Sequence, residues 1–252
     1  MISEITIVIV VALSLLSVVT TAVGVGLALL IRENRRAIAV GIGFSTGIMV
    51  LVSFVELMPE AAAAVGAGGA AASVLLGAGL LWAANGLLPH SHLVHEHGLD
   101  DTRLVRSVYL VVIGLILHDV PEGFAMANAF IASPSLGVLV ALEIALHNLP
   151  EELAMAVPAM ALRSTRFLVG AAVLSALAEP LGAVIGLLAV SVSPGLNGNF
   201  MAFAAGAMLF VSFHELVPMA RRYERMGWFG AGIFLSIAVH QLLAYLIRGY
   251  SW

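Results

Sequence analysis

Residues 43–61 read GFSTGIMVLVSFVELMPEA, and residues 202–220 read AFAAGAMLFVSFHELVPMA, an ungapped match with ten identities in nineteen positions. The shared Ser-Phe-x-Glu-Leu-x-Pro makes chance a poor explanation, even in a chain rich in Leu, Ala and Val. A self-match at a fixed offset indicates a duplicated structural unit. The sequence therefore predicts an internal repeat that relates the first part of the chain to the last.

Both copies lie in a chain that is far too apolar to be a soluble protein. Of its 252 residues, 61% are hydrophobic and 10% are charged, with a mean hydropathy of +1.07. A soluble domain carries about a quarter of its residues as charged side chains, so the exterior is expected to face lipid. The absence of cysteine excludes disulfides and thiolate ligands. The net charge of -4, without a basic arm, gives no indication of a nucleic-acid partner.

Eight apolar segments recur along the chain, each long enough at about 20 residues to cross ~30 Å of hydrocarbon. They lack the polar/apolar alternation of barrel strands. The expected fold is a single all-α, polytopic membrane domain over 1–252, and the first segment is expected to be retained, because no basic stretch precedes it. The segments are 5–31, 37–58, 70–88, 108–131, 136–162, 167–190, 200–220 and 228–247.

Arginine gives the expected orientation, because cations concentrate on the cytoplasmic side of a membrane protein. Ten of the eleven cations follow the first, third, fifth or seventh segment, and only Arg248 does not. Both termini are therefore expected outside, with the longest loop, 89–105, in the cytoplasm. The ten are Arg32, Arg35, Arg36, Arg103, Arg106, Arg163, Arg166, Arg221, Arg222 and Arg225.

This orientation makes the repeat an inverted one. The first copy runs outward in segment 2 and the second runs inward in segment 7, so segments 1–3 would be related to segments 6–8. Segments 4 and 5 remain as a central antiparallel pair. Inverted repeats around a midplane site are typical of secondary transporters. A channel built from a duplicated unit stays open as the alternative.

The central pair carries a second repeat, which is polar. His118-Asp119-Val120-Pro121-Glu122 matches His147-Asn148-Leu149-Pro150-Glu151, and in each copy the His and Glu share one helix face. An ionisable group at membrane depth costs ~2.5–3.5 kcal/mol, and these segments have no Lys or Arg to neutralise it. The neutralising charge would be protons or a metal such as Zn²⁺, with Fe²⁺, Mn²⁺ or Co²⁺ also open.

Other polar residues extend this hypothesis. Asp119 and Asn148, one position further round each helix, would serve a second ion or support the first, and Glu179 in segment 6 is expected to join the site. The remaining carboxylates and His214 have two interpretations. They could line outward and inward paths for the ion, or they could simply lie at the membrane interface. Four loop histidines indicate cytoplasmic metal binding, with a polar linker as the alternative. These residues are Glu56, Glu143, Glu152, His214, Glu215, His90, His92, His95 and His97.

HDVPEG, HNLPEE, AEPLGA, the eight segments and the histidine loop resemble the ZIP (Zrt/Irt-like) metal transporters, in particular their bacterial GufA-like branch. The resemblance implies uptake of Zn²⁺ and related ions across a prokaryotic cytoplasmic membrane, and a homodimer. It implies that segments 1, 4, 5 and 6 move as a block against the others. Asp119 stands where Asn is usual and Glu152 where Gly is usual, which puts the metal preference in question.

The resemblance also implies two metal sites that share ligands, with Glu122 and Glu151 bridging them. The first would use His118, Glu122, His147 and Glu151. The second would use Asp119, Glu122, Asn148, Glu151 and Glu179.

An enzyme is not predicted. HELVP at His214 begins like a zinc-protease motif, but Pro218 stands where the second His belongs. The Glu-x-x-His pairs of di-iron bundles are also missing from the sequence. The channel is the closer competitor, and saturable, metal-selective flux would distinguish a transporter from it.

Overall fold

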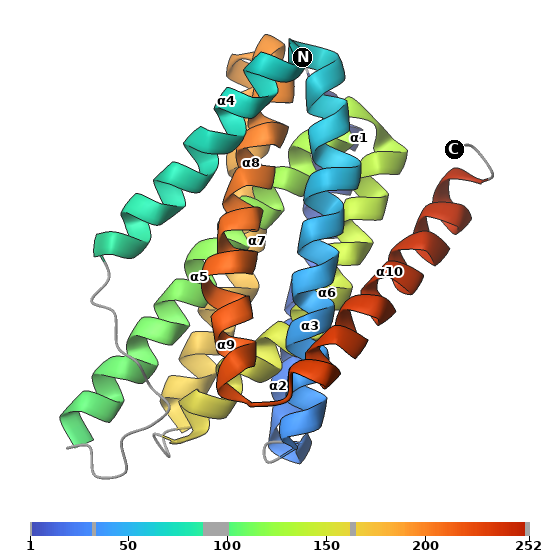
Figure 1. The fold of residues 1–252 in the computed structure, drawn as a ribbon. Helices are drawn as coiled ribbons and strands as arrows, with labels where there is room; N and C mark the ends of the chain where they lie inside the picture. The colour runs from blue at the N-terminus through green and yellow to red at the C-terminus, as the bar shows by residue number, and fades with distance from the viewer. Residues whose placement is uncertain (1, 32–33, 88–100, 162–164, 250–252) are drawn as a thin grey trace.

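The computed structural model describes residues 2–31, 34–87, 101–161 and 165–249. Within those ranges the chain is helical, with no strand, as the sequence predicts. Figure 1 shows long helices packed side by side in one bundle, with the start of α1 and the end of α10 toward the same end.

The chain begins with two collinear helices, α1 (Glu4–Ser14) and α2 (Leu16–Ile31). The Ser3 side chain accepts a hydrogen bond from the Thr6 amide and caps the first of them. Asn34 caps α3 (Arg35–Leu51) by accepting from the amides of Arg36 and Ala37. Both caps are polar residues that lie just before the predicted apolar segments 5–31 and 37–58.

Helix α3 continues through the π-helix η1 (Val52–Leu57) into α4 (Met58–Leu87). Gly66 interrupts α4 with φ 75° and ψ 158°, a conformation that only glycine adopts readily. The break falls between the predicted segments 37–58 and 70–88. The break at Gly66 thus divides one helical stretch into two helical segments.

Helices α5 (Asp101–Ala132) and α6 (Pro134–Ala161) form a tight antiparallel hairpin, joined through Ser133. Helix α5 begins at Asp101, so residues 101–105, which were predicted to belong to the loop 89–105, are helical. An aspartate favours the first turn of a helix because it faces the positive end of the helix dipole. Helix α7 (Thr165–Val192) then packs along α5.

The last third of the chain runs through η2 (Pro194–Leu196), α8 (Asn197–Val211), η3 (Ser212–Leu216), α9 (Val217–Arg222) and α10 (Met226–Arg248). Helix α8 lies beside α4, and α10 lies beside α3.

The two copies of the repeated motif share an unusual local structure, because η1 and η3 are both π-helices. Pro59 and Pro218 follow them. Proline crowds the carbonyl four residues earlier and cannot donate to it, and a widened turn relieves that contact. The sequence repeat predicts two similar segments but not their π-helical form.

Glycines bring the helices into backbone contact. A Cβ on Gly77 of α4 would lie 1.9 Å from the carbonyl oxygen of Phe203 in α8. A Cβ on Gly43 of α3 would lie 2.0 Å from that of Phe229 in α10. Small residues at such positions are the usual basis of helix association in a membrane. Within the described residues, five helical stretches are long and apolar enough to cross one.

Candidate metal centre

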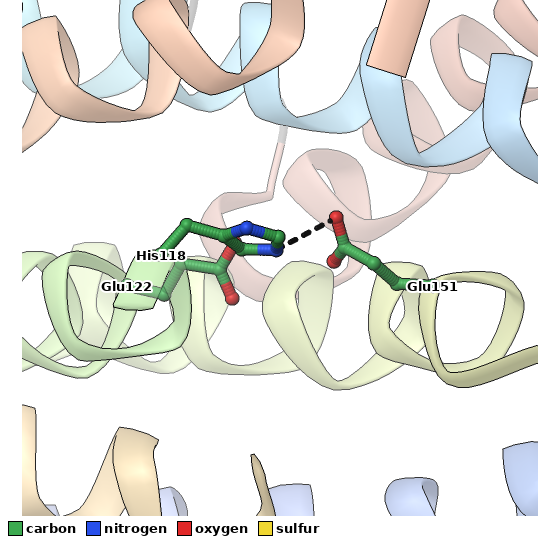
Figure 2. Close-up of side chains that lie close together, drawn as sticks. All are labelled: His118, Glu122 and Glu151. Atoms are coloured by element: carbon green, nitrogen blue, oxygen red, sulfur yellow. Dashed lines mark ion pairs between the residues drawn. The ribbon is translucent and has the colours of Figure 1, made fainter. Parts of the chain in front are cut away.

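The polar motifs of α5 and α6 face each other inside the bundle. His118 and Glu122 extend from α5, and His147 and Glu151 extend from α6, all four buried. Figure 2 shows the His118 ring directed across the gap to Glu151 on the neighbouring helix. The four-residue spacing within each motif places both side chains on the facing surface of its helix.

Each histidine pairs with the glutamate of the other motif. His118 Nε2 lies 3.1 Å from Glu151 Oε1, and His147 Nε2 lies 3.1 Å from Glu122 Oε1. His147 Nε2 is also 3.6 Å from Glu151 Oε2. One ligand atom each from His118, Glu122 and Glu151 falls within 4.8 Å of the others. This is a compact N/O donor set of the kind that suits Zn²⁺.

The orientation of His147 is fixed by its other nitrogen. Nδ1 lies 3.0 Å from the backbone carbonyl oxygen of Glu143, which can only accept, so Nδ1 donates. In the neutral ring, Nε2 then carries a lone pair that is directed at a carboxylate oxygen, which also bears lone pairs. A proton or a metal ion between the two atoms makes this contact favourable.

Several buried atoms of the centre make no hydrogen bond among the described residues, although His118 Nε2 and Glu151 Oε1 are 3.1 Å apart. They are both ring nitrogens of His118, Oε2 of Glu122 and both carboxylate oxygens of Glu151. Buried polar atoms are nearly always satisfied in folded proteins. The donor set is therefore arranged for a cation.

A second group of polar residues adjoins the first. The Asn148 side-chain amide donates to Glu179 Oε1, and Ser175 Oγ donates to Asp119 Oδ2 at 2.7 Å. Asp119 Oδ1 lies 3.7 Å from His118 Nε2. The structure thus brings the residues predicted for a second ion next to those predicted for the first.

Glu152 points away from the paired histidines, toward α2 and α7. Its Oε1 accepts from Thr21 Oγ1 at 3.0 Å and contacts Ser175 Oγ. The sequence analysis did not identify Thr21 and Ser175. Isolated hydroxyls in apolar segments commonly bond to their own helix backbone, so they carry little signal in a sequence.

Glu143 and Glu56 lie outside the centre, in a separate cluster with His240 and Arg248. His240 Nδ1 is 2.6 Å from Glu143 Oε1, and His240 Nε2 is 3.7 Å from Glu56 Oε1. Arg248 donates to both oxygens of Glu56. We call these four residues the outer cluster. The sequence analysis identified the two glutamates of this cluster as candidates for a metal path but did not connect them with His240 or Arg248.

The structure places His214 and Glu215, two candidates for a metal path, in different surroundings. Glu215 Oε2 is 4.0 Å from His118 Nδ1, whereas the exposed His214 ring stacks on Phe210 with centroids 4.7 Å apart. The four loop histidines, His90, His92, His95 and His97, lie outside the described residues.

Comparison with known proteins identifies the family of this chain. A model described as ZIP zinc transporter matches residues 85–228, a range that contains both polar motifs and Glu179. The chain is 34% identical over 234 residues to the zinc transporter ZupT of Chlorobium luteolum, covering 85% of this chain and 88% of that one. The chain belongs to the ZIP family. The resemblance predicted from the sequence is therefore confirmed at the level of the family.

This ZIP chain is also 41% identical over 162 residues to the zinc transporter GufA of Myxococcus xanthus, covering 62% of this chain and 63% of that one. The ZupT of Shigella flexneri is 36% identical over 196 residues, covering 72% of this chain and 74% of that one. These relatives are named as transporters and not as enzymes. The GufA-like branch stays a prediction, because relatives of both names are similar.

Proposed function

We propose that this ZIP protein carries divalent metal ions, Zn²⁺ first among them, into the cytoplasm through the centre between α5 and α6. The observation that carries the proposal is the crossed pairing, in which His118 faces Glu151 and His147 faces Glu122 at 3.1 Å. Residues 107–162 contain no Lys or Arg, so the parts of α5 and α6 that carry the two motifs supply no cationic side chain. The transported ion would supply the missing charge.

Two adjacent ions fit the donor groups, with Glu122 and Glu151 bridging. The first ion would bind the two histidines and these two glutamates. Asp119, Asn148 and Glu179 would complete the second site. Two divalent ions carry four positive charges, which offset four of the five carboxylates Asp119, Glu122, Glu151, Glu152 and Glu179. Glu152 would then remain as the supporting residue held by Thr21 and Ser175.

We further propose eight spans arranged as an inverted repeat. The two π-helices at the repeated motif support it, and so does the glycine packing. A Cβ on Gly47 would lie 3.3 Å from Ile233 Cα and closer still to Ser236, and one on Gly206 would lie 2.0 Å from the Val74 oxygen. The repeat offset that relates Gly47 to Gly206 also relates Val74 to Ile233. The same close contacts thus recur in both halves.

We also propose two bodies that move against each other, as the family resemblance implies, and close contacts join the helices within one of them. A Cβ on Gly24 would lie 2.7 Å from the Leu149 carbonyl oxygen, which joins α2 to α6, and one on Gly182 would lie 2.0 Å from that of Val120, which joins α7 to α5. Together with α1, which belongs to the same predicted segment as α2, these helices would form the block that carries the metal. Helices α3, α4, α8 and α10 would form the other.

The exposure of the two ends supports an inward-facing state. Glu56 and Glu143 are buried, whereas the Glu215 side chain is 23% exposed. In the orientation inferred from arginine, both termini lie outside, and the histidine loop 89–105 binds metal on the cytoplasmic face. The family resemblance supports a homodimer in the cytoplasmic membrane of a prokaryote.

Uptake by purified full-length protein in proteoliposomes with an entrapped metal-sensitive dye tests the proposal. We expect saturable Zn²⁺ entry at slow turnover, competition by other divalent ions, and loss of entry when Glu122 and Glu151 are replaced. Ohmic current without saturation would instead support the channel alternative. Full uptake by the doubly substituted protein would place the transport site elsewhere.

A further inference from the structure

Three of the four residues of the outer cluster form a chain of buried polar groups that come from three different helices. Glu56 is in η1, Glu143 is in α6 and His240 is in α10, and all three side chains are buried. His240 lies between the two carboxylates, with Nδ1 donating to Glu143 Oε1 at 2.6 Å and Nε2 facing Glu56 Oε1 at 3.7 Å. The imidazole therefore connects an outer carboxylate with one closer to the metal centre.

Two atoms of this cluster have no hydrogen-bond partner among the described residues, namely His240 Nε2 and Glu143 Oε2. Both belong to fully buried side chains. The 3.7 Å between His240 Nε2 and Glu56 Oε1 is close to the separation of two ligand atoms on one tetrahedral Zn²⁺, whose bonds are ~2.0–2.2 Å. The Nε2 side of the ring thus offers one imidazole nitrogen and the Glu56 carboxylate to a divalent metal ion, while Glu143 holds the ring by its opposite nitrogen.

A cationic side chain already lies on the outer carboxylate. The Arg248 guanidinium uses Nη1 and Nη2 to contact the two oxygens of Glu56, with Nη1 at 3.3 Å from Oε1. Such a two-pronged pair uses the same oxygens that a metal would need. The Arg248 side chain is 33% exposed, so it connects the buried cluster with the surface.

The cluster is also joined to the centre through the backbone. The carbonyl oxygen of Glu143 accepts from His147 Nδ1, whose ring faces Glu122. The side chain of Glu143 thus belongs to the outer cluster, while its backbone carbonyl contacts the metal centre.

We propose that Glu56 and His240 form a transit site for a divalent metal ion, that Glu143 orients His240 for it, and that Arg248 closes this site by occupying Glu56. The proposal rests on the transport function above and adds a site and a gate to it. An incoming ion and the guanidinium compete for the same carboxylate, so the ion enters only as Arg248 swings out. When the ion moves on to the centre, Arg248 returns and blocks its escape.

Metal binding by the full chain in detergent tests the transit site apart from the centre. The background is Glu122→Ala with Glu151→Ala, which disables the centre, and titration with Zn²⁺ or Cd²⁺ reports the remaining binding. We expect Arg248→Gln to tighten that binding at least ~10-fold, or ~1.4 kcal/mol, because Glu56 is freed. Arg248→Lys should tighten Zn²⁺ binding less, because an ammonium group still pairs with Glu56 but lacks the bidentate contact of the guanidinium.

Adding Glu56→Gln or His240→Gln to Arg248→Gln should remove the tightened binding. Gln241→Ala, at the exposed neighbour of His240, is the matched control and should change nothing. In the otherwise unchanged protein, Arg248→Gln should lower the external Zn²⁺ concentration that half-saturates uptake several-fold. The transit site is wrong if neither Arg248 variant tightens binding, or if the gain survives Glu56→Gln. Persistent transport in the Glu122/Glu151 background would contradict the central site and not this one.

Discussion

His147 Nδ1 donates a hydrogen bond to the backbone carbonyl of Glu143, 3.0 Å away and one turn earlier in α6. The contact fixes the imidazole so that Nε2 faces Glu122 across the hairpin. A ligand histidine held by its second nitrogen is oriented before the metal arrives, which reduces the cost of ordering it. The central site is therefore expected to depend most on its carboxylates, whose charge no hydrogen bond replaces.

Glu122→Ala and Glu151→Ala should each reduce initial Zn²⁺ uptake by at least about tenfold, and more than His118→Ala or Asn148→Ala does. Each glutamate would serve both ions, and loss even of supporting groups around a metal costs ~10–100-fold. Dye-loaded proteoliposomes with equal protein content provide the measurement. Glu60→Ala is the matched control, because Glu60 is exposed. Similar uptake by all the site variants would refute the assignment.

Asp119→Asn should preserve transport and change the order of preference among Zn²⁺, Cd²⁺, Mn²⁺ and Fe²⁺. The substitution keeps the shape of the side chain and one oxygen near Ser175 but removes a hard anionic ligand. Competition between ions in the uptake assay measures the order. An unchanged order would assign Asp119 to support of the site instead of to ligation.

Single cysteines should report alternating access when they replace Glu56 and Glu143, predicted for the outward path, or Met155 and Glu215, predicted for the inward path. The chain has no cysteine of its own, so the labelling has no background. Metal that favours the inward-facing state should protect positions 56 and 143 from a membrane-impermeant thiol reagent and expose positions 155 and 215. Protection is read as the fraction labelled with and without metal. Simultaneous labelling of both pairs with metal bound would favour a channel.

Gly77→Val should destabilise the protein, whereas Gly79→Val should not. A Cβ at Gly77 would overlap the Phe203 backbone, but one at Gly79, two residues along the same helix, meets nothing within 4 Å. Overpacking of this kind costs ~1–3 kcal/mol, and backbone cannot move aside as a flexible side chain would. Thermal aggregation in detergent, followed by size-exclusion chromatography, measures the difference. Equal losses would show that α4 and α8 are not in backbone contact.

The sequence predicted the helical class and the facing motifs for clear physical reasons. Hydropathy marks segments that lie in lipid, and a four-residue spacing fixes which side chains share a face, as with His118 and Glu122. The sequence could not place His240 between Glu143 and Glu56, because such contacts between distant helices depend on how the bundle packs. Nor could it show that Arg248, the one cation outside the expected loops, lies on Glu56.

The start of α5 and the supporting hydroxyls were missed for a different reason. Asp101 and its neighbours are polar and read as loop, although a polar turn continues a membrane helix into water without a change of backbone. Thr21 and Ser175 belong to apolar segments where a hydroxyl has a local backbone alternative. Their contact with Glu152 appears only when α2, α6 and α7 are assembled.

The π-helices η1 and η3 have a consequence for how this scaffold tolerates insertions and deletions. The amides of Met58 and Val217 bond to carbonyls five residues back, at Ser53 and Ser212, so each turn holds one residue more than an α-turn. Deleting one residue from either turn would restore the α-helical spacing, and Pro59 or Pro218 would then crowd the carbonyl four residues earlier and kink the helix. A one-residue deletion is therefore expected to distort the turns that present Glu56 and Glu215.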